Sequence, residues 1–566
     1  MTDESDDCSR PFILAVDGQT FIQHRTDYHS KGKHRHLPLP AFPINRAIQI
    51  WWRPLLRPVT FLGCARTVSA GWAILVASMK EATMAVNWTI TIEGKNEFGD
   101  VCRKEVRIDK SWERLFDGDL GLSIEDGKKI MEALQNAVVN QEAETYSLYR
   151  RVCPDCHAFR AVKDYTTRRI RTVFGTVRVR NPRWMVCSDC YPGMVGAFAP
   201  LKEICPDRAT SELMELTARL GSVMPYRQAA NVLTKFLPVE PTETHATVRK
   251  RTIRVGERID DQVAREEWHA RREMEERHQL EMSLPGDRSK EFVISIDTAH
   301  VRSAEPNSGR NFELVVARCG RGGRGDVGGR YFATASTEQK AIRDRTLHAL
   351  RREGYCGFGD VTVLSDGAEI LKRLPRAMPK PTTHIIDWFH IAMRVQPMQQ
   401  IADYMVRSQS DLSETLSSID REIRAVKWRL WHGRVDRAIR DLERLLARLK
   451  PTQGVFSLAR LHSLGSQLLT YIRSNRVAIV DYRQRYRAGL RVATTLAESA
   501  VNSLVGKRMV KKQQMRWTLH GAHMLMQVRA AEINGELRDR LRAPFRQPGP
   551  NVPSLFNPKP PLLRAA

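Results

Sequence analysis

The sequence predicts an α/β fold in which short buried strands alternate with helices. Three stretches rich in apolar and β-branched residues each end in an aspartate, at EFVISID (291–297), VTVLSD (361–366) and TTHIID (382–387). Two Cys-x-x-Cys pairs lie upstream of these stretches, and a long run of helical pattern lies downstream. Buried strands, a cysteine-rich module and helical segments together predict several domains of mixed class.

The composition is strongly basic. Lys and Arg number 90 against 64 Asp and Glu, which gives a net charge of +26. This excess favours nucleic acid as the partner. It does not favour a membrane, because we find neither a basic amphipathic helix nor an anchor. The most apolar stretch, 59–79, is interrupted by Arg66, and the first residues are acidic, unlike a secretory signal. We expect a soluble, cytoplasmic, nucleoid-associated protein with reduced thiols.

Residues 1–83 show no sustained helical or strand period. We expect them to be a poorly ordered extension. The alternative is that the translation start has been assigned too far upstream and that translation begins near Met79 or Met84. From residue 84 the alternation in VNWTITIEGKN predicts a strand. Residues 84–150 therefore predict a small α+β unit that ends in a long helix.

Four of the five cysteines within residues 151–205 predict a zinc ribbon. Thirty residues of mostly strand-like sequence separate the two pairs, which are Cys153 with Cys156 and Cys187 with Cys190. Four thiolates in two tight turns suit tetrahedral Zn²⁺. The alternative is a redox pair or incidental cysteines. The ribbon would also direct basic side chains toward phosphates, namely Arg178, Arg180 and Arg183.

Residues 206–260 predict a helix-turn-helix region. Three helical patches are separated by breaks at 221–225 and 238–241. The third patch resembles a helix that enters a DNA groove, because it carries four basic residues, Arg249, Lys250, Arg251 and Arg254. An ordinary helical hairpin with a solvated basic face is the alternative. Residues 261–290 predict a charged helical linker.

Residues 291–400 predict three antiparallel strands followed by alternating helices and strands. This order matches the ribonuclease-H-like fold, in which Asp297 and Asp366 would end on adjacent strands. Two neighbouring carboxylates are costly unless a cation lies between them. Oxygen ligands suit Mg²⁺ or Mn²⁺.

A third acid is expected on a helix over residues 489–509. Glu498 lies there among almost wholly apolar turns, with Asn502 four residues further on. A solvated glutamate is the alternative. On either side of this stretch the sequence predicts three further regions. Residues 401–488 predict an all-helical insertion, residues 489–540 the remainder of the catalytic core, and residues 541–566 a Pro-rich disordered tail.

Four blocks resemble a known family. SIDTAHVRS, VLSDGAEILKRLP, HIIDWFHIAMR and TLAESAVNSL, in this order, resemble the DDE transposases of the bacterial ISKra-four insertion-sequence family and, more distantly, Mutator-type transposases. The likeness covers about residues 84–540; residues 1–83 depart from it. It implies Asp297, Asp366 and Glu498 as the catalytic, metal-binding triad. It also implies accessory roles for Asp387 and His390, which match an Asp-x-x-His signature. The alternative for His390 is a hydrogen-bonded histidine of the core.

The resulting hypothesis is a transposase that binds the terminal inverted repeats of its own element as a homo-oligomer. It would hydrolyse the phosphodiester at the element end and use the released 3′-OH to attack target DNA. Asn502 would be a further accessory residue. The alternatives are a DNA-binding regulator built on the ribbon and helix-turn-helix region, or a domesticated nuclease that cuts without joining.

Overall fold

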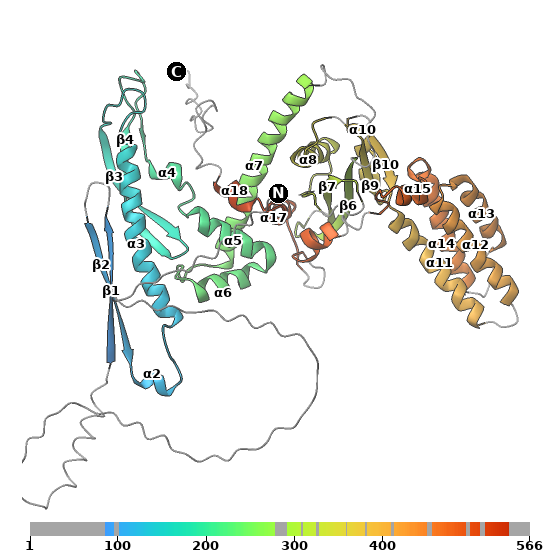
Figure 1. Ribbon diagram of the computed structural model, residues 1–566, viewed down its shortest axis with the longest axis horizontal. Helices are drawn as coiled ribbons and strands as arrows, with labels where there is room; N and C mark the ends of the chain where they lie inside the picture. Colours follow the sequence, from blue (N-terminus) through green and yellow to red (C-terminus); the bar gives the residue numbers. More distant parts are fainter. Residues whose placement is uncertain are drawn as a thin grey trace, which may run out of the picture. The chain divides into compact units, whose positions relative to one another are not determined.

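The computed structural model confirms a mixed α/β protein with helices around a mixed sheet (Figure 1). None of the helices in the described part is long and apolar enough to cross a membrane. The expected N-terminal extension and all but the first two residues of the expected tail lie outside the described residues. The structure describes residues 85–95, 101–277, 291–306, 309–323, 328–357, 359–379, 382–408, 413–449, 456–493, 499–509 and 515–542.

The first sheet is a hairpin followed by helices. Strand β1 (Ala85–Lys95) pairs antiparallel with β2 (Val101–Ser111), and a short helix α2 (Glu113–Phe116) follows. Helix α3 (Ile124–Tyr149) begins with a capping box in which the side chains of Ser123 and Asp126 each accept a hydrogen bond from the other's backbone N–H. This reciprocal cap fixes the start of a helix on which the next sheet packs.

The second sheet has three antiparallel strands: β3 (Val162–Thr172), β4 (Gly175–Met185) and β5 (Ala197–Phe198). Val177 and Val179 of β4 alternate with arginines and pack with α3 in a small core. A short helix, α4 (Leu201–Ile204), follows.

Three helices come next: α5 (Ser211–Val223), α6 (Tyr226–Phe236) and α7 (His245–Arg277). The domain boundary expected at residue 260 does not coincide with a helix end, because α7 continues without a break to Arg277. Its buried residues recur at helical spacing across the expected boundary, and Gly256 among them does not interrupt the helix; they are Val248, Val255, Ile259 and Val263.

The third sheet is mixed, with strand order β10-β9-β6-β7-β8. The first three strands along the chain are antiparallel, and β9 and β10 then run parallel to β6. The strand bounds are β6 (Phe292–Arg302), β7 (Asn311–Arg321), β8 (Arg330–Thr334), β9 (Val361–Ser365) and β10 (Thr382–Ile386).

Helices cover both faces of this sheet. Ile294 and Ile296 of β6 pack with α8 (Gln339–Arg352), α9 (Glu369–Lys372) and α10 (Leu374–Ala377). The alternate residue Val293 belongs to the core of the opposite face. Continuous apolar strands are expected when both faces are buried.

A helical region follows β10, and its core is continuous with one face of the sheet. The region comprises α11 (Trp388–Ser408), α12 (Ser413–Trp431), α13 (Val435–Arg448), α14 (Phe456–Ser474), η3 (Arg476–Ala478) and α15 (Tyr482–Arg487). Apolar side chains at helical spacing on α12 and α13 form part of this core, as their sequence indicated.

The C-terminal helices join two cores. Helix α17 (Leu519–Ile533) contributes Val528 and Ala531 to the core of α5–α7, and Leu525 and Met526 to the core at the antiparallel strands. Helix α18 (Leu537–Arg542) extends the first of these cores. The three-helix region is therefore packed on a helix that comes from nearly three hundred residues further along the chain.

The expected helix over residues 489–509 is confirmed only in part, because residues 499–506 are helical and residues 489–493 are not. Gly489 has a φ of 72°, Leu490 forms a β-bridge with Gly323, and the residues up to Ala493 are not helical. Residues 502–506 form a π-helical turn, η4 (Asn502–Gly506). Strand-like contacts compete with helix formation here, and π turns are frequent at functional sites.

Candidate metal centre and acidic strand edge

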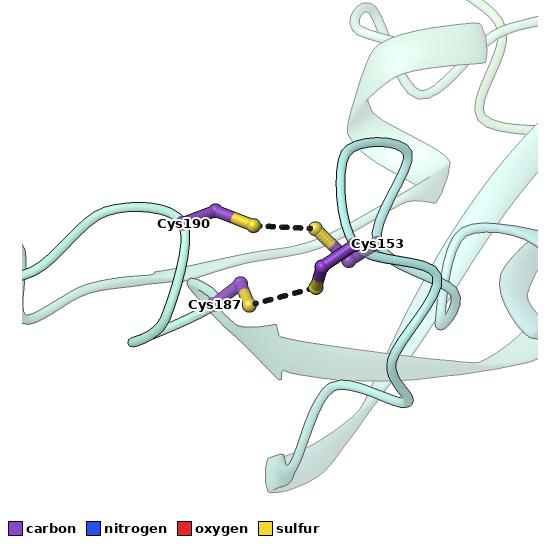
Figure 2. A group of neighbouring side chains, drawn as sticks. Cys153, Cys187 and Cys190 are labelled. Atoms are coloured by element: carbon purple, nitrogen blue, oxygen red, sulfur yellow. Dashed lines mark hydrogen bonds between the residues drawn. The ribbon is translucent and has the colours of Figure 1, made fainter.

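The four predicted cysteines form one cluster. The sulfur atoms of Cys153, Cys156, Cys187 and Cys190 all lie within 4.8 Å of one another (Figure 2). Two of the separations are 3.8 Å, between Cys153 and Cys190, and 3.5 Å, between Cys156 and Cys187. A tetrahedron with Zn–S bonds of about 2.3 Å has sulfur atoms about 3.8 Å apart. The cluster therefore fits a metal such as zinc.

The two cysteine pairs lie in similar turns. The N–H of His157 donates to the carbonyl of Cys153 at 2.9 Å, and the N–H of Tyr191 donates to that of Cys187 at 3.1 Å. Each turn brings its two sulfur atoms to the same side. His157 has a φ of 59°, a left-handed conformation that few non-glycine residues adopt and that turns the chain sharply after the second cysteine.

The thiols of the cluster differ in acidity. Hydrogen bonds from the backbone N–H groups of Cys156 and Asp155 lower the pKa of Cys153 to about 6. The neighbouring Cys156 thiol is the main cause that raises the pKa of Cys190. Cys153 is thus the first of these two thiols to supply the thiolate that metal binding requires.

The predicted aspartates gather at one edge of the mixed sheet. Ser295 of β6 pairs with Leu364 of β9, and continuing this parallel register by two residues sets Asp297 beside Asp366. Ile386 of β10 pairs with Ser365, so Asp387 follows at the same level on the next strand. The parallel register thus sets three carboxylates at one level of the sheet, where β9 and β10 end. Asp297 does not end its strand as its sequence suggested, because β6 continues to Arg302.

Local hydrogen bonds orient these carboxylates. The Oδ1 atom of Asp297 accepts from the N–H of Thr298 at 2.7 Å, and that of Asp366 accepts from the N–H of Ala368 at 2.8 Å. Both aspartates are partly exposed. Among the described residues no three carboxylates are as close together as the four cysteines, and the predicted third acid, Glu498, lies outside those residues.

Asp387 and His390 belong together but differ from the other two acids. Asp387 is fully buried, and its Oδ1 atom accepts from the N–H of Phe389 at 2.7 Å. His390 Nε2 is a buried atom that lies 3.8 Å from Asp387 Oδ2 and has no hydrogen-bond partner among the described residues. The two side chains therefore face each other one helical turn apart, without a hydrogen bond between them.

Two tyrosines of the helical region support the acidic edge, and the sequence analysis did not single them out. Tyr471 donates its hydroxyl to the backbone carbonyl of Asp366 at 2.8 Å, and Tyr482 donates to that of Ile386 at 2.8 Å. Burial raises the pKa of both tyrosines. For Tyr471 the sequence signal is a polar aromatic residue among the apolar residues of α14, which predicts a buried hydroxyl with a partner. Tyr482 has no such signal, because the rest of its helix, YRQRYR, is polar or aromatic.

The basic residues predicted to contact DNA do not behave alike. Arg249, Lys250 and Arg254 are exposed on α7, although Arg254 pairs with Asp207 at 2.9 Å. Arg251 is buried in an ion pair of 2.8 Å with Glu243. Burial in such a pair does not favour a phosphate contact by Arg251, and that assignment stays a prediction.

Asn502 is exposed in the π-helical turn, whereas its neighbour Leu504 is fully buried. On the ribbon, Arg183 pairs with Asp164, whereas Arg178 and Arg180 are exposed. Neither a model of a known protein family nor any curated protein sequence matches the chain.

Proposed function

We propose that the protein is a DDE transposase whose mixed sheet is the core of a ribonuclease-H-like catalytic domain. The observation that carries this proposal is the register between β6 and β9, which supports a shared site for Asp297 and Asp366. A sheet of three antiparallel strands followed by two parallel strands is also the topology expected for this fold. Two carboxylates at one level of adjacent strands are a suitable donor set for Mg²⁺ or Mn²⁺.

The chain's own residues would hold and orient the reacting groups. Bound Mg²⁺ or Mn²⁺ would stabilise the attacking and leaving oxygens of an in-line phosphoryl displacement. Asp297 and Asp366 would be its ligands, each turned by a hydrogen bond from a backbone N–H group. This fixed geometry suits a site that must position a phosphodiester within a few tenths of an ångström.

Glu498 would complete the triad. The residues on both sides of its segment contact the sheet that carries the two aspartates. Val492 accepts a hydrogen bond from the N–H of Trp388, next to Asp387, at 3.0 Å. Ala500 is fully buried in the core that includes Ala299 of β6. Glu498 itself lies outside the described residues, and its role stays a prediction from the resemblance.

DNA binding would combine the zinc ribbon with a helix-turn-helix region formed by α5, α6 and α7. Arg249 and Lys250 are exposed near the start of α7, where a groove-reading helix would need them. The proposed activity is cleavage at the terminal repeats of an insertion sequence by a homo-oligomer on the nucleoid, followed by attack of the 3′-OH on target DNA. The resemblance to ISKra-four transposases stays a prediction.

The test compares Asp366→Asn with Asp360→Asn in the full-length protein. Asp360 immediately precedes β9, at the opposite end of the strand from Asp366, so it is a matched control. Both variants and the wild type are incubated with Mg²⁺ and a duplex that carries one inverted repeat flanking the gene. Asp366→Asn should lower strand cleavage by orders of magnitude, whereas Asp360→Asn should cleave normally.

A gel shift on the same duplex separates binding from chemistry. Binding should be unchanged in both variants, because it depends on cationic side chains elsewhere. If Asp366→Asn cleaves at the wild-type rate, the strand-end aspartates are not catalytic. Cleavage without any joined product would instead identify a nuclease that lacks strand transfer.

One observation favours a DNA-binding regulator as the second candidate. The side chains of Asp366 and Asp387 each accept from the N–H two residues further on, at 2.8 and 2.7 Å. Aspartates make this turn in many proteins without catalysis. A regulator predicts that the wild type binds the repeat but never cleaves it in Mg²⁺, and that Asp366→Asn lowers only stability.

A further inference from the structure

The hairpin of β3 and β4 has one covered face and one open face. Ile170, Val177 and Val179 pack with Val139 and Ala143 of α3, which runs beside the hairpin (Figure 1). Successive residues of a strand point to opposite faces. The open face is therefore formed by the alternate cross-strand pairs, which are Tyr165 with Pro182, Thr167 with Arg180, Arg169 with Arg178, and Arg171 with Thr176.

The open face carries four arginines and no acid from either strand. The acid in these strands, Asp164, is on the covered side, where it pairs with Arg183. One outside carboxylate, Glu240, contacts both Arg169 and Arg171. Arg178 and Arg180 form no ion pair within the described residues; we call the face defined by Arg169, Arg171, Arg178 and Arg180 the ribbon face.

The pairing of Arg169 with Arg178 brings two like charges together, of which Glu240 offsets only that of Arg169. The two residues are directly opposite each other in the register, and like charges in this position destabilise an antiparallel pair. Arg180 lies 3.8 Å from the ring centroid of Tyr165, which holds its guanidinium over the same face. Arrangements that oppose local stability usually serve a ligand, and here the ligand must be anionic.

We propose that the ribbon face docks on the sugar–phosphate backbone of duplex DNA. Arg178 and Arg180 are two residues apart on one strand, a separation of about 6.8 Å, and Arg169 adds a third cation across the hairpin. A row of cations fits a polyanionic chain better than a single phosphate. Arginine binds phosphate oxygens in pairs of hydrogen bonds. Such contacts fix the position of a protein on DNA without reading its sequence.

This inference rests on the part of the proposed function that makes DNA the partner, but it concerns neither the acidic strand edge nor α7. The test therefore uses a duplex of random sequence without Mg²⁺, so that cleavage and repeat recognition play no part. Zinc-loaded full-length protein is compared with the double variant Arg178→Gln/Arg180→Gln. The affinity of each is measured between 50 and 200 mM salt.

Loss of two phosphate contacts should reduce the slope of log affinity against log salt by about 2. The ratio of the wild-type affinity to the affinity of the double variant should accordingly be about tenfold larger at 50 mM than at 200 mM salt. The preference for a terminal repeat over random DNA should not change. Arg178→Lys/Arg180→Lys should recover most of the slope, because the charges remain.

The matched control removes two exposed cations from another strand. Arg103 and Arg107 lie on β2, where Glu93 is opposite Arg103 and Glu105 lies between them. Arg103→Gln/Arg107→Gln should leave the slope near the wild-type value. An equal slope for the two glutamine variants, at equal zinc content, would overturn the ribbon-face proposal. So would a loss restricted to duplex RNA. Absence of any DNA binding by the wild type would instead overturn the proposed function as well.

Discussion

The cysteine cluster and the acidic strand edge are built in opposite ways. The cysteines come from two short turns, each of which brings its pair of thiols together through one backbone hydrogen bond. The aspartates come from three strands and are brought to one level only when the strands pair in parallel register. The first site depends on local geometry and the second on the topology of a whole sheet.

This difference has an energetic consequence. The cysteine cluster has only a small core behind it, formed by residues of α3, β3 and β4 together with Leu201 and Cys205. A metal would therefore contribute much of the ribbon's stability. The acidic edge is backed by large cores on both faces of the sheet. Removing one carboxylate there should change chemistry far more than folding.

The largest effect on stability is expected for Cys156→Ser. The hydroxyl of serine is a poor zinc ligand, and the three remaining thiolates cannot close the tetrahedron. The ribbon should lose its metal and unfold as a unit, since zinc binding supplies folding free energy directly. The measurements are zinc content and protease sensitivity of residues 151–205.

Cys205→Ser is the matched control, because Cys205 is buried outside the cluster and its thiol donates to the carbonyl of Ala209. This variant should retain zinc. A Cys156→Ser protein that keeps a full equivalent of zinc and resists protease would show that the four cysteines are not a metal centre.

The same contrast explains what the sequence could predict. Cys-x-x-Cys spacing determines the approach of two sulfur atoms, so all four cysteines could be grouped from sequence alone. The mixed sheet could be anticipated from the order of strands and helices. The burial of Arg251 could not be anticipated, because its partner Glu243 lies in a loop whose path depends on tertiary packing.

Helix α17 shows a signal that the sequence analysis did not use. LHGAHMLMQVRAAEI has apolar residues on all sides, as is typical of a helix buried between two layers. Arg529 within it donates to the carbonyls of Ser222 and Ser503, which joins α5 to η4. Such links between distant segments are not encoded in local periodicity, so domain boundaries drawn from the sequence missed them.

An intermediate effect is expected for Tyr482→Phe. Tyr482 is fully buried, and its hydroxyl supports the last residue of β10. Loss of the hydrogen bond should lower the free energy of unfolding by about 1–2 kcal/mol, with little change in packing volume. Urea unfolding measures this effect, and Tyr404→Phe is the control, because the Tyr404 side chain on α11 is exposed. Equal midpoints for the two variants would mean that the hydroxyl contributes nothing to the acidic edge.

The smallest effect is a pH dependence that tests how α7 is joined to the sheet. Burial acts to raise the pKa of Asp260, but hydrogen bonds and charges from His523 and Arg345 outweigh it and lower the pKa to about 2. A carboxyl pKa that is lower in the folded than in the unfolded protein stabilises the fold at pH values above the unfolded pKa near 4, and this contribution is lost as the pH falls toward 2.

Asp260→Asn should remove this stabilising contribution. The difference in free energy of unfolding between wild type and variant should therefore shrink by about 1 kcal/mol, after allowance for partial exposure, between pH 5 and pH 2.5. Asp261→Asn, at the exposed neighbouring position, should give no such change. Because His523 belongs to α17 and Arg345 to α8, a difference that stays constant with pH would show that this ion pair does not join the three-helix region to the sheet.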